Sequence, residues 1–114
     1  MATHLEADIE AKVKECSQMI HDYLHQADAF YGLKKFDRAA KHFDVVMRVA
    51  ASLRGTCDVA VQYNIRSTEM RDLGEKATKL HHQCHEHIIV MRELARQERI
   101  HNGHLVIPAD CQNN

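Results

Sequence analysis

Apolar residues recur along most of this chain at alternating intervals of four and three positions, which is the spacing of one face of an α-helix. The first such series predicts a helix over residues 4–31 that ends at Gly32, because glycine is common directly after a helix end. The second predicts a helix over residues 34–54 that lies antiparallel to the first, since the link between them is short. The first series is Ile9, Val13, Cys16, Ile20, Tyr23, Ala27 and Phe30, and the second is Phe36, Ala39, Phe43, Val46, Ala50 and Leu53.

A third apolar series predicts one long helix over residues 57–101. Arg66 and His87 interrupt it, but its phase passes unbroken through Gly74. A turn at Gly74 would need extra residues and a new capping residue, and Glu75-Lys76 supplies neither. The alternative is a four-helix bundle with a corner at Gly74. The series is Tyr63, Met70, Leu73, Ala77, Leu80, Cys84, Met91 and Leu94.

These segments predict an all-α protein, an antiparallel three-helix bundle whose third helix overhangs the other two. Residues 1–102 form one domain, and residues 103–114 form a non-helical tail because Gly103 and Pro108 disfavour a helix. At 1.5 Å per residue the third helix is much the longest, and we expect it to leave the first two near residue 78.

The predicted overhang contains the densest apolar run of the chain, "HIIVM" at residues 87–91. A soluble monomer does not normally expose such a surface, so we expect it to bind a second copy or a partner helix. The contact residues predicted for this interaction are Leu80, Cys84, His87, Ile88, Met91 and Leu94.

Charge and composition narrow the function classes. The 15 basic and 16 acidic side chains leave a net charge of −1, so the basic excess typical of nucleic-acid binders is missing. No apolar run approaches the roughly 20 residues that span a bilayer, and the N-terminus does not resemble a secretory signal. We therefore expect no membrane partner and a cytoplasmic location, with a nuclear one also compatible, and reduced cysteines.

The stretch "HHQCHEH" at residues 81–87 is the one candidate metal site. His81 and His85 are four positions apart and share a helix face, but two ligands make only half of a closed zinc site. Further ligands would have to come from His21, His25 or His42. We interpret these histidines as structural and expect no cofactor, with a histidine-rich zinc site as the alternative.

One pattern suggests an enzyme. "RQERIH" places Arg96 and His101 at the Arg-four-residues-His spacing of the HEPN superfamily of helical ribonucleases. That resemblance implies metal-independent RNA cleavage, with Arg96 and His101 meeting their counterparts across a dimer. No phosphate-binding loop, nucleophile elbow or paired catalytic carboxylates accompany it.

A second resemblance covers residues 23–46, "YLHQADAFYGLKKFDRAAKHFDVV". The segment resembles a single tetratricopeptide-type helical hairpin, and no second copy follows. A lone hairpin with a third helix resembles the MIT domains, three-helix modules that bind partner helices in their grooves, and "GEKATKLHH" at residues 74–82 is similar to the third helix of that family. The matching positions are Tyr23, Ala27 and Phe30 in one helix and Phe36, Ala39 and Phe43 in the next.

Together these observations predict a non-catalytic helical adaptor or assembly subunit. It would mediate protein–protein interaction through a coiled-coil-like surface on its third helix and self-associate there. The HEPN-like ribonuclease and the metal-binding bundle stay open as alternatives.

Overall fold

The computed structural model describes residues 4–106, with side chains as far as residue 102, and contains three helices there. They are α1 (His4–Gly32), α2 (Phe36–Gln62) and α3 (Ser67–Val106). The predicted all-α class and three-helix bundle are thus confirmed. The four-helix alternative is wrong, because α3 continues through Gly74 without a break.

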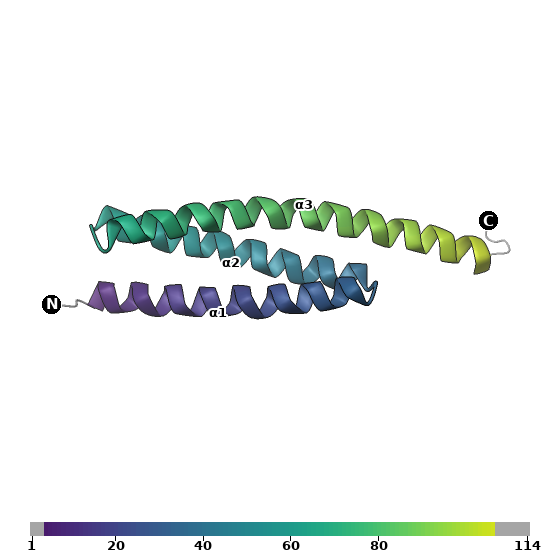
Figure 1. The fold of residues 1–114 in the computed structure, drawn as a ribbon, viewed down its shortest axis with the longest axis horizontal. Coiled ribbons are helices and arrows are strands. Elements are labelled where there is room, and N and C mark those ends of the chain that lie inside the picture. Colours follow the sequence, from purple (N-terminus) through teal and green to yellow (C-terminus); the bar gives the residue numbers. More distant parts are fainter. Residues whose placement is uncertain (1–3, 107–114) are drawn as a thin grey trace.

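The helices form a rod about 70 Å long and 19 × 18 Å across. α2 lies between its neighbours and packs along both of them, and each neighbour runs antiparallel to it (Figure 1). The start of α1 lies at the same end of the rod as the α2–α3 turn. At the opposite end, α3 runs on past the turn that joins α1 and α2 (Figure 1).

The first turn does not use glycine as the residue that reverses the chain. Gly32 is the last residue of α1, and Lys34 takes the left-handed conformation with φ 60°. The N–H of Lys35 then bonds the Phe30 carbonyl at 2.8 Å and that of Lys34 bonds the Tyr31 carbonyl at 2.9 Å. This is the Schellman arrangement, which satisfies the last carbonyls of a helix.

The second turn lies further along the chain than predicted. α2 continues through Gly55 to Gln62, so the predicted end at residue 54 and the predicted start of the third helix at residue 57 are both wrong. Asn64, with φ 57°, takes the left-handed position, and the Ile65 N–H bonds the Ala60 carbonyl at 2.8 Å. The Ser67 hydroxyl donates to the Asn64 side-chain oxygen at 2.7 Å where α3 begins.

The longer α2 changes where α3 becomes an overhang. The prediction that α3 leaves the bundle near residue 78 is wrong, because Arg99 still pairs with Asp37 of α2, with Nη1 and Oδ2 3.0 Å apart. The overhang is therefore only the C-terminal end of α3 (Figure 1). The helix also continues to Val106, so residues 103–106 of the predicted non-helical tail are helical. Residues 107–114 lie outside the described part.

The core consists of two clusters, each built from all three helices. Ile20 packs against both, so the core is continuous along the rod. Cluster I, nearer the α1–α2 turn, contains Ala27, Ala39, Ala40, Phe43, Val46, Cys84, Ile88 and Met91. Cluster II, nearer the α2–α3 turn, contains Ile9, Cys16, Leu53, Cys57, Ala60, Met70 and Ala77.

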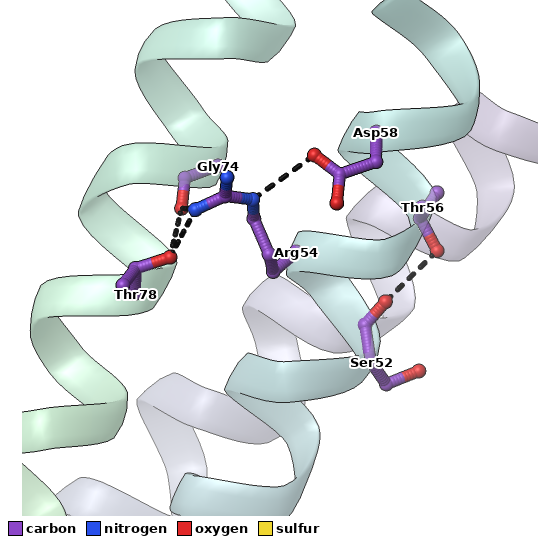
Figure 2. Close-up of polar contacts among 6 residues, drawn as sticks. All are labelled: Ser52, Arg54, Thr56, Asp58, Gly74 and Thr78. Atoms are coloured by element: carbon purple, nitrogen blue, oxygen red, sulfur yellow. Dashed lines mark hydrogen bonds and ion pairs between the residues drawn. The ribbon is translucent and has the colours of Figure 1, made fainter. Parts of the chain in front are cut away.

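Gly74 is a point of close helix contact. A Cβ atom on it would lie 3.2 Å from Cδ of Arg54 and 3.3 Å from Cβ of Cys57. Arg54 reaches across this contact from α2: its Nη1 donates to the Gly74 carbonyl at 3.5 Å and to the Thr78 hydroxyl, and its Nε donates to Asp58 at 3.0 Å (Figure 2). The missing side chain thus lets α2 and α3 approach closely.

Candidate interaction surface on α3

Most of the predicted contact residues lie in the chain's own core. Cys84, Ile88 and Met91 are 0%, 4% and 4% exposed, and Leu80 and Leu94 are partly buried against the same cluster I. They face α2, because α2 is longer than predicted and still accompanies α3 here. We call the buried row of Cys84, Ile88, Met91 and Ala95 the inner face of α3.

His87, the polar member of the predicted set, lies at the rim of this core. Its side chain is exposed, and its ring stacks on the ring of Phe43 with centroids 5.0 Å apart and an angle of 28° between the planes. The imidazole therefore covers part of one face of a buried aromatic ring while it remains accessible to water. That contact explains how a histidine occupies a position of the apolar series.

The predicted metal ligands His81 and His85 do not form a group with further ligand side chains in the described part of the chain. His81 places Nδ1 3.1 Å from the Met47 carbonyl of α2, and its ring meets the His82 ring edge-on at 5.7 Å. His85 lies exposed one turn further along. Among residues 4–102 no group of three His, Cys, Asp or Glu side chains is arranged to hold a metal ion. The hydrogen bond gives His81 a structural role between α2 and α3.

Another candidate ligand, His42, is surrounded by a backbone carbonyl and two aromatic rings. Its Nδ1 lies 2.9 Å from the Arg38 carbonyl, within α2. Its ring lies 4.9 Å from that of Phe30 and 5.5 Å from that of Tyr23, centroid to centroid. The imidazole thus fills space between α1 and α2 beside aromatic rings.

Arg96 and His101, the residues of the HEPN-like pattern, lie on one continuous helix. Five positions correspond to about 140° of rotation, so the two side chains diverge within a single chain. Arg96 bonds Glu93 with Nε–Oε1 at 3.0 Å and Nη2–Oε2 at 2.5 Å. The hydrogen bond from Arg96 and, to a smaller extent, that from Gln97 lower the pKa of Glu93. The hydrogen bond to the Glu93 carboxylate in turn raises the pKa of Arg96.

The cysteines in the described part of the chain are buried, and two of them have thiol pKa values above the usual range, which is the opposite of what a nucleophilic cysteine needs. Burial raises the pKa of the Cys84 thiol to about 11, and burial followed by the nearby Asp58 carboxylate raises the pKa of Cys57. Both thiols are therefore protonated at neutral pH, whereas a nucleophilic cysteine needs its thiolate. Cys16, Cys57 and Cys84 are all free and buried.

Exposed apolar residues remain on the opposite side of α3. Ile89 and Ile100 are each 57% exposed, and they stand in one row with the exposed Glu93 and Arg96 at intervals of four, three and four positions. A helix turns by about 100° per residue, so this row points about 140° away from the inner face. We call Ile89, Glu93, Arg96 and Ile100 the outer stripe.

A hollow of about 220 Å³ lies where the start of α2 meets the end of α3. Basic residues Lys34, Lys35 and Arg38 line it together with Glu98 of α3. Arg99 and Asp37, which form an ion pair, also line it. Its lining therefore combines basic and acidic side chains.

Compared with known protein families, curated proteins and solved structures, the chain matches none. Within the described residues, the three helices lack the length of apolar sequence that crossing a membrane requires.

Proposed function

We propose that this protein is a non-catalytic helical adaptor or assembly subunit that binds another helix through the outer stripe of α3. The observation that carries the proposal is the pair Ile89 and Ile100, each 57% exposed on a regular helix. Their positions belong to one row with the four-three-four spacing of a coiled-coil seam. Val90, 51% exposed, widens the apolar surface at one side of this row.

A binding role agrees with the chemistry of the described side chains better than a catalytic role does. The buried thiols are protonated, Arg96 is occupied by Glu93, and His81 is bonded to a backbone carbonyl. The predicted resemblance to MIT modules also favours a helical partner. A helix that presents an apolar row to another helix needs no further chemistry to bind it.

A photo-crosslinking amino acid placed at position 89 or at position 100 tests this function in the cells that produce the protein. We expect covalent adducts with a second polypeptide, either another copy or a different protein. The matched control carries the same crosslinker at Val59, an exposed apolar residue of α2. Absence of adducts at 89 and 100, or equal adducts from position 59, would contradict the proposed function.

A further inference from the structure

The outer stripe has the same spacing when it is followed in either direction. Its intervals are four, three and four, and its residues are Ile89, Glu93, Arg96 and Ile100. A two-fold axis between positions 94 and 95 exchanges 89 with 100 and 93 with 96. It therefore exchanges isoleucine with isoleucine and acid with base. Such self-complementarity is what a two-fold interface between identical chains requires.

We propose that the outer stripe binds the outer stripe of a second copy of this chain in antiparallel orientation. Ile89 then packs against Ile100 of the partner subunit, and Glu93 lies opposite Arg96 of the partner subunit. This inference rests on the proposed function and names the partner that the stripe binds. In heptad terms Ile89 and Arg96 occupy d positions, and Glu93 and Ile100 occupy a positions. Each contact therefore pairs a d position of one chain with an a position of the other, as in antiparallel coiled coils.

The charges determine the orientation. In a parallel pair, Glu93 would lie opposite the same carboxylate of the second copy and Arg96 opposite the same guanidinium. Both juxtapositions are repulsive, and like charges in register disfavour a pairing mode. In the antiparallel pair, two carboxylates and two guanidinium groups form one network. Each Arg96 can retain its bonds to Glu93 of its own helix, which are 3.0 and 2.5 Å long.

The end of α3 gives a second reason for this partner. Arg99 pairs with Asp37 near the start of α2, and beyond it α3 projects past the α1–α2 turn (Figure 1). In the antiparallel pair, residues 100–106 of one chain run beside positions 83–89 of the other, whose outward side is free of α1 and α2. Each projecting end is thereby covered by the partner helix. Because the contact involves a single helix from each chain, we expect a concentration-dependent dimer.

Charge exchange combined with sedimentation velocity tests the pairing. We expect wild type to form dimers as its concentration rises, and Glu93→Arg or Arg96→Glu alone to weaken dimerisation by at least about tenfold, because each creates four like charges. The double variant Glu93→Arg/Arg96→Glu again places opposite charges at positions 93 and 96 of the two chains, and we expect it to dimerise like wild type. An equimolar mixture of the two single variants should form a heterodimer for the same reason. Circular dichroism checks that each variant stays helical.

Disulfide trapping tests the orientation. In a Cys111→Ser background, Ile89→Cys chains mixed with Ile100→Cys chains should form mixed disulfides. Neither should form a disulfide with itself, because eleven positions along the helix separate like residues by about 16 Å. Faster self-disulfide formation by Ile89→Cys would overturn the antiparallel orientation.

The two proposals fail in different ways. A wild-type chain that stays monomeric at its solubility limit, or dimers unaffected by the single charge changes, would overturn the self-pairing. Crosslinks from position 89 to a different protein in that case would still support the proposed function. Absence of both dimers and crosslinks would overturn both.

Discussion

The two faces of α3 have the same helical spacing and opposite environments. The inner face places Cys84, Ile88 and Met91 in cluster I with almost no exposure, whereas the outer stripe leaves Ile89 and Ile100 more than half exposed. The neighbours Ile88 and Ile89 show the difference within one residue type. Heptad spacing thus indicates that a helix has a contact face. The length of the adjacent helix decides which of its apolar residues are buried within the same chain.

The largest expected effect comes from these adjacent isoleucines. Ile88→Ala should lower the free energy of unfolding by about 2–5 kcal/mol, because it removes buried methyl groups and leaves a cavity. Ile89→Ala should stay within about 0.5 kcal/mol of wild type in dilute solution, since its side chain is exposed in the monomer. Urea denaturation followed by circular dichroism measures both. Equal losses in dilute solution would show that the two faces do not differ in burial.

The sequence was sufficient to predict the helical class and the first helix from heptad spacing, and the antiparallel hairpin from the short link between the first two helices. The predicted position of the second turn is wrong because Gly55 lies inside α2 and does not mark its end. None of the three glycines that the structure describes with their surroundings, Gly32, Gly55 and Gly74, has a positive φ. The left-handed positions fall instead to Lys34, Asn64 and Arg66.

A usable signal for the second turn was present in "NIRSTE" at residues 64–69. Asparagine is the residue other than glycine that most often takes the left-handed position after a helix. Ser67 and the acidic Glu69 then suit the start of the next helix. The misplaced turn also displaced the candidate site, because a second helix that ends at residue 54 leaves Ile88 and Met91 without a neighbouring helix, whereas the observed α2 buries both. The exposure of Ile89 follows from the true register of α2 and α3.

The next largest effect concerns the close contact of α3 with α2 at Gly74. Gly74→Val should lower the free energy of unfolding by about 1–3 kcal/mol, because any Cβ there lies 3.3 Å from the Cβ of Cys57, which cannot move without α2. Gly55→Val is the matched control: its added Cβ meets nothing within 4 Å. We expect it to leave stability unchanged or slightly raised. Thermal or urea unfolding compares the two, and similar losses would contradict a special contact at Gly74.

Alkaline pH should lower the stability of the folded protein through Cys84, whose thiol is buried. The pKa of Cys84 rises from near 9 to about 11 through burial, so the folded state holds this proton more tightly than the unfolded state. Its contribution to stability is complete below about pH 9 and is lost as the pH rises through about 11. We expect the urea midpoint of wild type to fall over this range, and that of Cys84→Ala to fall less. Equal slopes for the two proteins would contradict the assignment to Cys84.

An alkylating reagent at pH 8 provides a second readout of the same difference. Cys84 should react only on unfolding, because its sulfur is inaccessible and protonated. In dilute solution, where the chain is monomeric, a cysteine introduced by Ile89→Cys should react in the folded protein at the rate of an exposed thiol. Mass spectrometry of digested protein identifies the labelled positions, and prompt labelling of Cys84 in the folded state would show that the inner face opens.

The smallest effect tests whether an exposed side chain can belong to the α2–α3 contact. Arg54 and Arg48 both lie on α2 and each pairs with an aspartate four positions away, Asp58 at 3.0 Å and Asp44 at 3.1 Å. Arg54 alone of the two is bonded to Thr78 and the Gly74 carbonyl of α3 (Figure 2). Arg54→Met should therefore cost about 1 kcal/mol more than Arg48→Met, the usual net worth of a hydrogen bond across a helix contact. The difference between their urea midpoints measures this contribution, and no difference would mean that the close packing at Gly74 holds α2 and α3 together without Arg54.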